Sequence, residues 1–107
     1  HPALPDDPGH ELWKRDFLGA SGLFGTTLKP CPREALGALI DDLELFGMGA
    51  SWGGYESLIL PQDPNSMRSV APWPYDGPCL RFHIGLEDTD DLITDLDAGF
   101  KRLNAAL

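Results

Sequence analysis

Leu80-Arg81-Phe82-His83-Ile84-Gly85-Leu86 is the stretch that decides the fold, because it alternates cleanly between apolar and polar positions. Such a period of two predicts a β-strand with one buried face. The apolar residues of the stretch share the face toward the core. Arg81 and His83 share the opposite face, which we expect to be half-polar and to meet another surface.

A helix is expected directly after this strand. Asp88 or Thr89 would cap it, with aspartates in its first turn and basic residues near its end, as the helix dipole favours. Its expected core face consists of Leu92, Ile93, Leu96, Phe100, Leu103 and Leu107.

Further elements are expected toward the N-terminus. Residues 1–8 would be extended or irregular because of their prolines. The other periodic segments predict helices over 9–18 and 33–46, the second beginning with Pro32 as its first residue, and strands over 23–29 and 55–60. Between Pro61 and Pro78, five prolines would forbid a helix and allow only short edge pairing near 69–71. The fold class is therefore α/β, an α+β sandwich with a mixed or antiparallel sheet of three to four strands and helices on one face.

Length and charge limit what the chain can be. Its 107 residues predict a single domain, and the formal net charge of −9 at pH 7 argues against binding to nucleic acid or an anionic membrane. No apolar run is long enough for a membrane span. Two distant cysteines, Cys31 and Cys79, suit a reduced cytoplasmic protein, although one disulfide stays possible. The chain begins at His1 without an initiator methionine, which suggests part of a longer protein, either in nature or as trimmed for expression.

A glycine-rich stretch, Gly49-Ala50-Ser51-Trp52-Gly53-Gly54, precedes the strand expected over 55–60. It matches the G-x-S-x-G pattern of a hydrolase nucleophile, and Asp63 or Asp76 followed by His83 would complete a triad. That nucleophile requires a strand before the serine and a helix after it, whereas the reverse is expected here. Ser51 and Trp52 are better explained as a turn that presents two side chains at a site, or as a loop that glycine merely keeps short.

Arg81 is the strongest candidate for binding. A permanent charge in the middle of a strand needs a partner, and a guanidinium on a rigid strand is well suited to grip a carboxylate ligand. An internal salt bridge and simple exposure are the alternatives. His83 is expected to be a packed or hydrogen-bonded neighbour. None of the three lysines looks desolvated enough for a nucleophile, and the histidines and cysteines lack metal-ligand spacing, so neither a catalytic residue nor a metal ligand is expected.

Five stretches together resemble a known family: His1–Leu4, Gly9–Phe17, Ser21–Phe24, Ser51–Leu58 and Arg81–Asp88. Together they are similar to the C-terminal domain of the bacterial cystathionine β-lyases, members of the Cys/Met-metabolism family of pyridoxal-phosphate enzymes with the aspartate-aminotransferase fold. The tryptophan of Ser51-Trp52-Gly53-Gly54 distinguishes that group from relatives that carry leucine there.

The resemblance implies a substrate-recognition domain over residues 1–107, with Arg81 binding the substrate α-carboxylate and Ser51 and Trp52 lining the site. Pyridoxal 5′-phosphate and its lysine would belong to a large domain absent from this chain, so the chain alone would be inactive. The implied reaction converts cystathionine to homocysteine, pyruvate and ammonia, in transsulfuration and methionine biosynthesis. The implied partners are the large domain, a small amino-acid substrate and further copies in a homotetramer. The alternative is a free-standing module that binds a carboxylate or a protein without catalysis.

Overall fold

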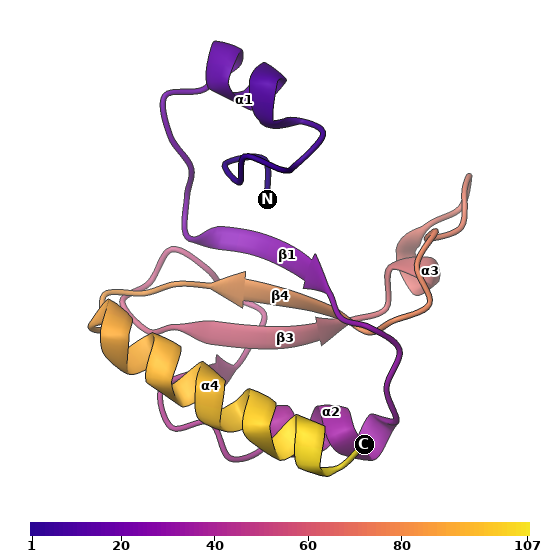
Figure 1. Ribbon diagram of the computed structural model, residues 1–107, viewed down its shortest axis with the longest axis vertical. Helices are drawn as coiled ribbons and strands as arrows, with labels where there is room; N and C mark the ends of the chain where they lie inside the picture. Colours follow the sequence, from indigo (N-terminus) through magenta and orange to yellow (C-terminus); the bar gives the residue numbers. More distant parts are fainter.

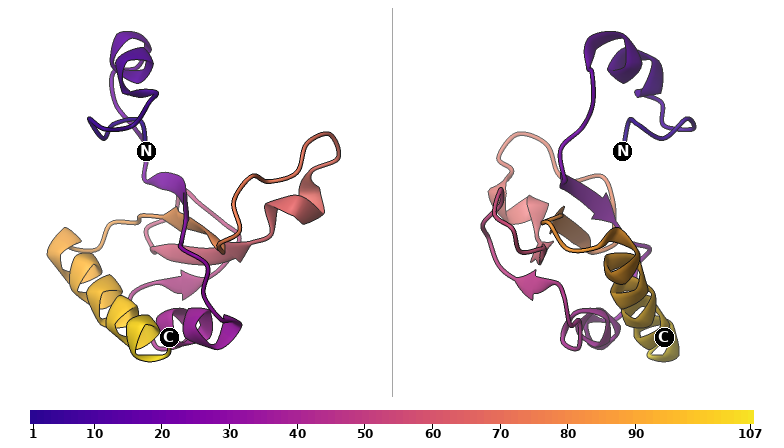
Figure 2. Two further views of the ribbon diagram at one scale, coloured as in Figure 1. Left: turned by 45° about the vertical axis from the view of Figure 1, so that its right-hand side comes forward. Right: turned by 90° about the vertical axis from the view of Figure 1, so that its left-hand side faces the viewer.

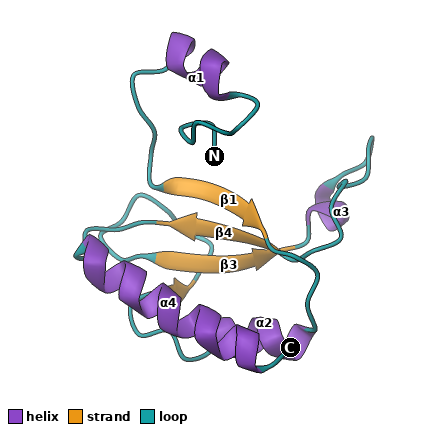
Figure 3. Ribbon diagram, in the orientation of Figure 1, coloured by secondary structure: helices purple, strands orange, loops and turns teal.

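The computed structural model describes all residues from His1 to Leu107. A four-stranded mixed sheet in the order β1-β4-β3-β2 forms its centre (Figures 1 and 3). β4 runs antiparallel to β1 and β3, while β2 runs parallel to β3. The elements in chain order are α1 (His10–Asp16), β1 (Leu23–Thr27), α2 (Arg33–Ile40), β2 (Gly47–Met48), β3 (Leu58–Gln62), α3 (Pro64–Met67), β4 (Cys79–His83) and α4 (Thr89–Ala105). The predicted fold class is confirmed.

β4 is an inner strand, and its alternation divides the sheet into two faces. Phe82 pairs with Phe24 on β1 and with Ile59 on β3, and these apolar residues face the core. Arg81 pairs with Gly25 and Leu60, on the opposite face. Each large apolar side chain fully buried in this core stabilises the fold by about 1.5–3 kcal/mol. The buried core comprises Ala35, Leu39, Ile40, Phe46, Ile59, Leu80, Phe82, Leu92 and Leu103.

Helices α2 and α4 cover the core face of the sheet together (Figure 2). Asp88 caps α4 as predicted, accepting hydrogen bonds from the backbone of Asp90 and Asp91. Of the expected core face of α4, Leu92 and Leu103 are buried, and Leu96 and Phe100 pack against the core. The prediction is wrong for Ile93 and Leu107, which are exposed. Ile93 lies outside the apolar stripe that faces the sheet, and Leu107 lies beyond the end of α4 at Ala105.

Helix α2 ends at Ile40, six residues before the predicted end, and Pro32 is its N-cap, not its first residue. Two interactions from α4 explain the early end. Arg102 donates to the carbonyl oxygens of Ala38 and Leu39, and the Asp95 carboxylate accepts from the backbone N–H of Glu44 and of Leu45. These side chains satisfy the backbone groups that a continued helix would otherwise pair.

The region after the glycine stretch also differs from expectation. The strand predicted over 55–60 is β3, shifted to Leu58–Gln62, and it includes Pro61. A proline is tolerated there because β2 pairs only with Leu58 and Ile59, which leaves the far end of β3 as an edge. The five prolines do not forbid a helix: Pro64 occupies the first turn of α3, capped by Asp63. No strand forms around 69–71.

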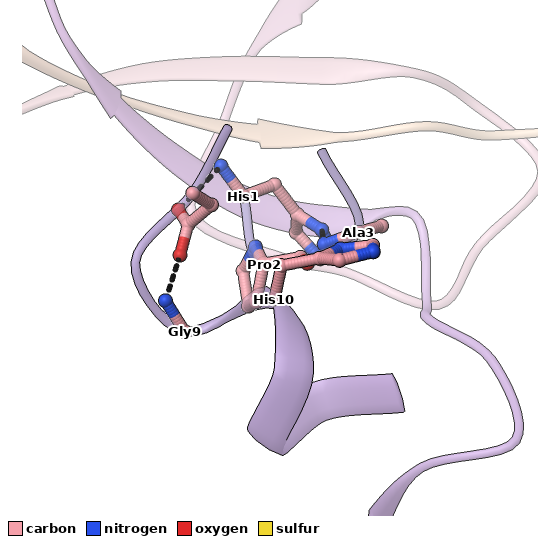
Figure 4. A network of polar contacts seen from close by, with 6 residues as sticks. His1, Pro2, Ala3, Gly9 and His10 are labelled. Carbon is pink, nitrogen blue, oxygen red and sulfur yellow. Dashed lines mark hydrogen bonds and ion pairs between the residues drawn. The ribbon is translucent and has the colours of Figure 1, made fainter. Parts of the chain in front are cut away.

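The N-terminal segment consists of turns rather than extended chain, and with α1 it lies beyond β1 (Figure 1). Polar contacts within the segment hold it together (Figure 4). His10 Nδ1 lies 2.8 Å from the carbonyl oxygen of Pro2, and Asp7 accepts from the backbone N–H of Gly9 at 2.8 Å. Trp13 of α1 stacks on the ring of His10. No residue of α1 is buried, so the helix predicted over 9–18 forms without a contribution to the core.

Candidate functional site

The glycine-rich loop, defined here as residues 49–57, lies over the polar face of the sheet between β2 and β3. Its contacts with Arg81 and His83 establish this position, because both side chains point away from the core. Gly53 has φ of +80°, a conformation that side chains rarely adopt. The face expected to meet another surface therefore meets the chain's own loop.

Arg81 is half-buried and forms no ion pair, since the ion pairs of the structure involve only the N-terminus, Arg15 and Lys101. Its only hydrogen bonds run from Nη2 to the carbonyl oxygens of Gly49 and Ser51, at 3.5 and 3.4 Å. Both are long, so the guanidinium keeps donors for a further acceptor. The internal salt bridge considered as an alternative does not form.

Trp52 lies beside this arginine and does not join the core. The Arg81 Cζ atom is 5.5 Å from the centre of the indole ring, within the range of a cation–π contact. The Trp52 side chain is 61% exposed, and Ser51 is exposed as well. The structure thus brings together all three predicted site residues, Ser51, Trp52 and Arg81. An open face of this kind can receive the carboxylate of a ligand beside an aromatic wall.

His83 is buried, with 7% of its surface exposed, and serves the loop backbone. Its Nδ1 lies 3.4 Å from the backbone nitrogen of Gly53 and its Nε2 lies 3.1 Å from the carbonyl oxygen of Gly54. His83 makes no hydrogen bond to Ser51. A helix and a two-residue strand precede the serine and a strand follows it, so the hydrolase interpretation fails on geometry as well as on order.

Sequence reasoning assigned no role to Glu87 and Ser57, which join the loop to the segment after β4. The Glu87 carboxylate accepts from the backbone N–H and from the hydroxyl of Ser57, both at 2.7 Å. These hydrogen bonds, the hydroxyl's first, lower the pKa of Glu87 below its ordinary value. The pair is separated by 30 residues, so no periodicity or spacing could have indicated it.

The glycine-rich loop and β4 do not fit the attachment of a pyridoxal cofactor, because neither carries a lysine. Lys14, Lys29 and Lys101 are all exposed and none lies in the loop or on β4, and Lys101 pairs with Asp97 at 2.6 Å. No group of three histidine, cysteine or acidic side chains is placed to hold a metal ion. Cys31 and Cys79 are free thiols.

None of the principal clefts is lined by Ser51, Trp52 or Arg81, so these residues form one wall rather than an enclosed pocket.

No helix of the structure has the length and apolar character needed to cross a membrane. 

Comparison with known proteins identifies relatives with similar sequences. The chain is 53% identical over 107 residues to cystathionine β-lyase MetC of Escherichia coli. The match covers 96% of this chain and 27% of that protein. It is 51% identical over 105 residues to an L-alanine/L-glutamate racemase of Wolbachia pipientis, covering 96% of this chain and 26% of the relative. The chain thus spans about a quarter of the length of these curated relatives.

A solved structure shows the same fold. Cystathionine γ-synthase from Xanthomonas oryzae, in complex with aminoacrylate and cysteine, superposes with a TM-score of 0.79 at 34% identity, over 99% of this chain and 28% of that one. The Cys/Met metabolism PLP-dependent enzyme family matches residues 1–101. The match spans nearly the whole sequence, and the chain belongs to the Cys/Met metabolism PLP-dependent enzyme family.

Proposed function

We propose that this chain is the substrate-recognition domain of a pyridoxal-phosphate-dependent carbon–sulfur lyase that converts cystathionine to homocysteine, pyruvate and ammonia. The observation that carries the proposal is Arg81, a half-buried guanidinium without a protein carboxylate as partner. A charge held in this way on an inner strand is incomplete until a ligand carboxylate binds it.

Arg81 would bind the substrate α-carboxylate through its planar fork, and its place on β4 would restrict the movement of the bound group. Ser51 and Trp52 would line the adjacent wall, with the exposed indole against the substrate. Fixing the carboxylate and one side of the substrate orients Cα and the hydrogen that leaves it. Orientation of this kind supplies a large part of many enzymatic rate enhancements.

The cofactor would be bound by parts of the protein outside this chain, because the lysines here are exposed and none belongs to the glycine-rich loop or to β4. When bound, pyridoxal phosphate supplies an electron sink for the charge that develops at Cα. Following the resemblance, we propose that the chain is the C-terminal domain, packed against a large domain upstream, and inactive by itself. A lysine-bearing domain located downstream would overturn this order without affecting the role of Arg81.

The assembly and location follow the same resemblance. We propose a homotetramer of the full-length protein in the cytoplasm, where two unpaired thiols such as Cys31 and Cys79 are stable. A sedimentation measurement on the full-length protein tests the assembly, and a dimer or monomer would contradict it.

Amino-acid racemisation is a second candidate, favoured by the 51% identity to the L-alanine/L-glutamate racemase. Alanine, glutamate and cystathionine all carry an α-carboxylate, so the proposed task of Arg81 is common to both reactions. Formation of pyruvate from cystathionine supports the lyase, whereas interconversion of alanine enantiomers without pyruvate supports the racemase. A protein that binds carboxylates and shows neither activity would support a free-standing binding module.

The test compares the full-length protein with its Arg81→Ala variant on cystathionine and on an analogue without the α-carboxylate nearest the reacting carbon. The wild type should strongly prefer cystathionine by kcat/KM. The variant should lose most of that preference, because its site no longer distinguishes the two substrates. An Arg81→Ala protein with unchanged preference would remove Arg81 from this role.

A further inference from the structure

The glycine-rich loop is attached firmly at its end and only weakly at Arg81. At the end, Ser57 is fully buried, and both its N–H and its hydroxyl donate to the Glu87 carboxylate at 2.7 Å. The Ser57 hydroxyl also accepts from the backbone N–H of Gly85 at 2.9 Å. Hydrogen bonds to an ionised carboxylate are shorter and stronger than neutral ones. Glu87 thus joins two segments that the sequence separates.

The backbone around this contact allows little adjustment. The backbone N–H of Leu86 donates to the carbonyl oxygen of Tyr55 at 2.8 Å, parallel to the Glu87 contact. A Cβ atom at Gly85 would collide with the same carbonyl oxygen, so the two segments touch backbone to backbone. The register between residues 55–57 and 85–87 is therefore fixed.

His83 attaches the middle of the loop from the same side. The backbone N–H of Gly53 faces Nδ1 at 3.4 Å, which makes Nδ1 the acceptor and leaves Nε2 as the donor to the carbonyl oxygen of Gly54 at 3.1 Å. Around Arg81, by contrast, the hydrogen bonds to the loop are 3.4 and 3.5 Å long. Arg81 therefore does not hold the loop in place. The position of the loop over Arg81 must come from its contacts with His83 and Glu87.

We propose that Glu87 is a positioning residue for the substrate carboxylate, acting through Ser57 on the loop that carries Ser51 and Trp52. The inference deepens the proposed function and rests on it. Glu87 fixes where the loop lies above β4, and thereby the width of the space between Trp52 and Arg81. Without the carboxylate, the N–H and hydroxyl of Ser57 lose their acceptor inside the protein, and the loop must move to expose them to water.

The experiment uses the full-length protein in four forms: wild type, Glu87→Ala, Glu87→Gln and Glu44→Ala. Glu44 is the matched control, an exposed glutamate near the helices whose side chain makes no hydrogen bond. Hydrogen exchange by mass spectrometry follows the amides of residues 50–57, and steady-state kinetics separate KM from kcat. Should Glu87→Ala fail to fold, Ser57→Ala replaces it, because that variant removes only the hydroxyl link.

Glu87→Ala should exchange about tenfold faster or more in residues 50–57 and raise KM for the substrate by a similar factor, with a smaller effect on kcat. Glu87→Gln should recover much of both, because its amide oxygen still accepts from Ser57. Glu44→Ala should match the wild type in both measurements.

Unchanged exchange in residues 50–57 would overturn the inference. So would a lower melting temperature with KM unchanged, since Glu87 would then be merely structural. The proposed function fails separately: if Arg81→Ala retains full kcat/KM, the carboxylate site itself is wrong. If Arg81→Ala loses activity while Glu87→Ala keeps its KM, only the positioning role is wrong.

Discussion

Replacing Arg81 with methionine should abolish most of the activity while leaving the fold almost intact. Arg81 contributes two long hydrogen bonds and one cation–π contact to the folded chain, and it has no ion pair. A cation–π contact near the surface is worth about 0.5–1 kcal/mol, and methionine keeps much of the apolar stem. We therefore expect the melting temperature to fall by no more than about 5 °C.

The effect on catalysis should be much larger. Removing one partner of a desolvated charge pair costs about 2–5 kcal/mol, which corresponds to a loss of roughly 30- to 5,000-fold in kcat/KM. Arg81→Lys should fall in between, because an ammonium keeps the charge but loses the planar fork.

Arg102→Met is the matched control, since it removes another arginine with a purely structural task. Arg102 donates to the last carbonyl oxygens of α2, at 2.9 Å to Ala38 and 3.3 Å to Leu39. Its loss should cost about 1–3 kcal/mol of stability and leave the kcat/KM of the remaining folded protein unchanged. Thermal unfolding and initial rates, measured on the same full-length preparations, check both variants. The reasoning is refuted if Arg81→Met loses as much stability as Arg102→Met, or if it retains wild-type kcat/KM.

Three further perturbations have definite expected outcomes. Gly85→Ala should destabilise the protein by more than about 2 kcal/mol, because the new Cβ collides with the Tyr55 carbonyl oxygen; a urea midpoint equal to that of the wild type would contradict this. Leu39→Ala, at a fully buried position in the last turn of α2, should cost about 2–5 kcal/mol in the same urea titration, and a loss below about 1 kcal/mol would show a loosely packed core. The lowered pKa of Glu87 makes its hydrogen bonds a source of stability above its ordinary pKa of 4.5, lost as the pH falls through the lowered value. The stability difference between wild type and Glu87→Gln should therefore be constant above about pH 5 and shrink in more acidic buffer, and a difference that grew on acidification would reverse the assigned sign.

The sequence was sufficient for those parts of the fold that follow local periodicity. The alternation over 80–86 correctly indicated a strand with Arg81 and His83 on the polar face, and the cap at Asp88 was predicted. The prediction is wrong at the end of the stretch, because the strand ends at His83 and Leu86 is exposed instead of facing the core. Two of the errors lie where a distant side chain satisfies the backbone. Asp95 ends α2 early by binding N–H groups about 50 residues away, and Glu87 keeps Ser57 out of the strand that was expected to include it.

The candidate site divides in the same way. Arg81 could be singled out because a permanent charge is costly within an apolar alternation, and Trp52 because glycines surround it. Glu87 could not, since it stands beside the aspartates of a helix start and its interaction with Ser57 requires the folded register. The residues proposed to touch a ligand thus left a trace in the sequence, whereas the residue inferred to position them left none.

The exposed position of Trp52 has a consequence for how new specificities arise. Its indole is 61% exposed, and the loop that carries it is attached through other residues. Substitution at position 52 should therefore alter substrate preference at little cost to folding, while β4 continues to present Arg81. The substrate preference of such a domain can therefore evolve separately from its ability to fold. A small library of variants at position 52 would be an efficient way to search for new substrate preferences.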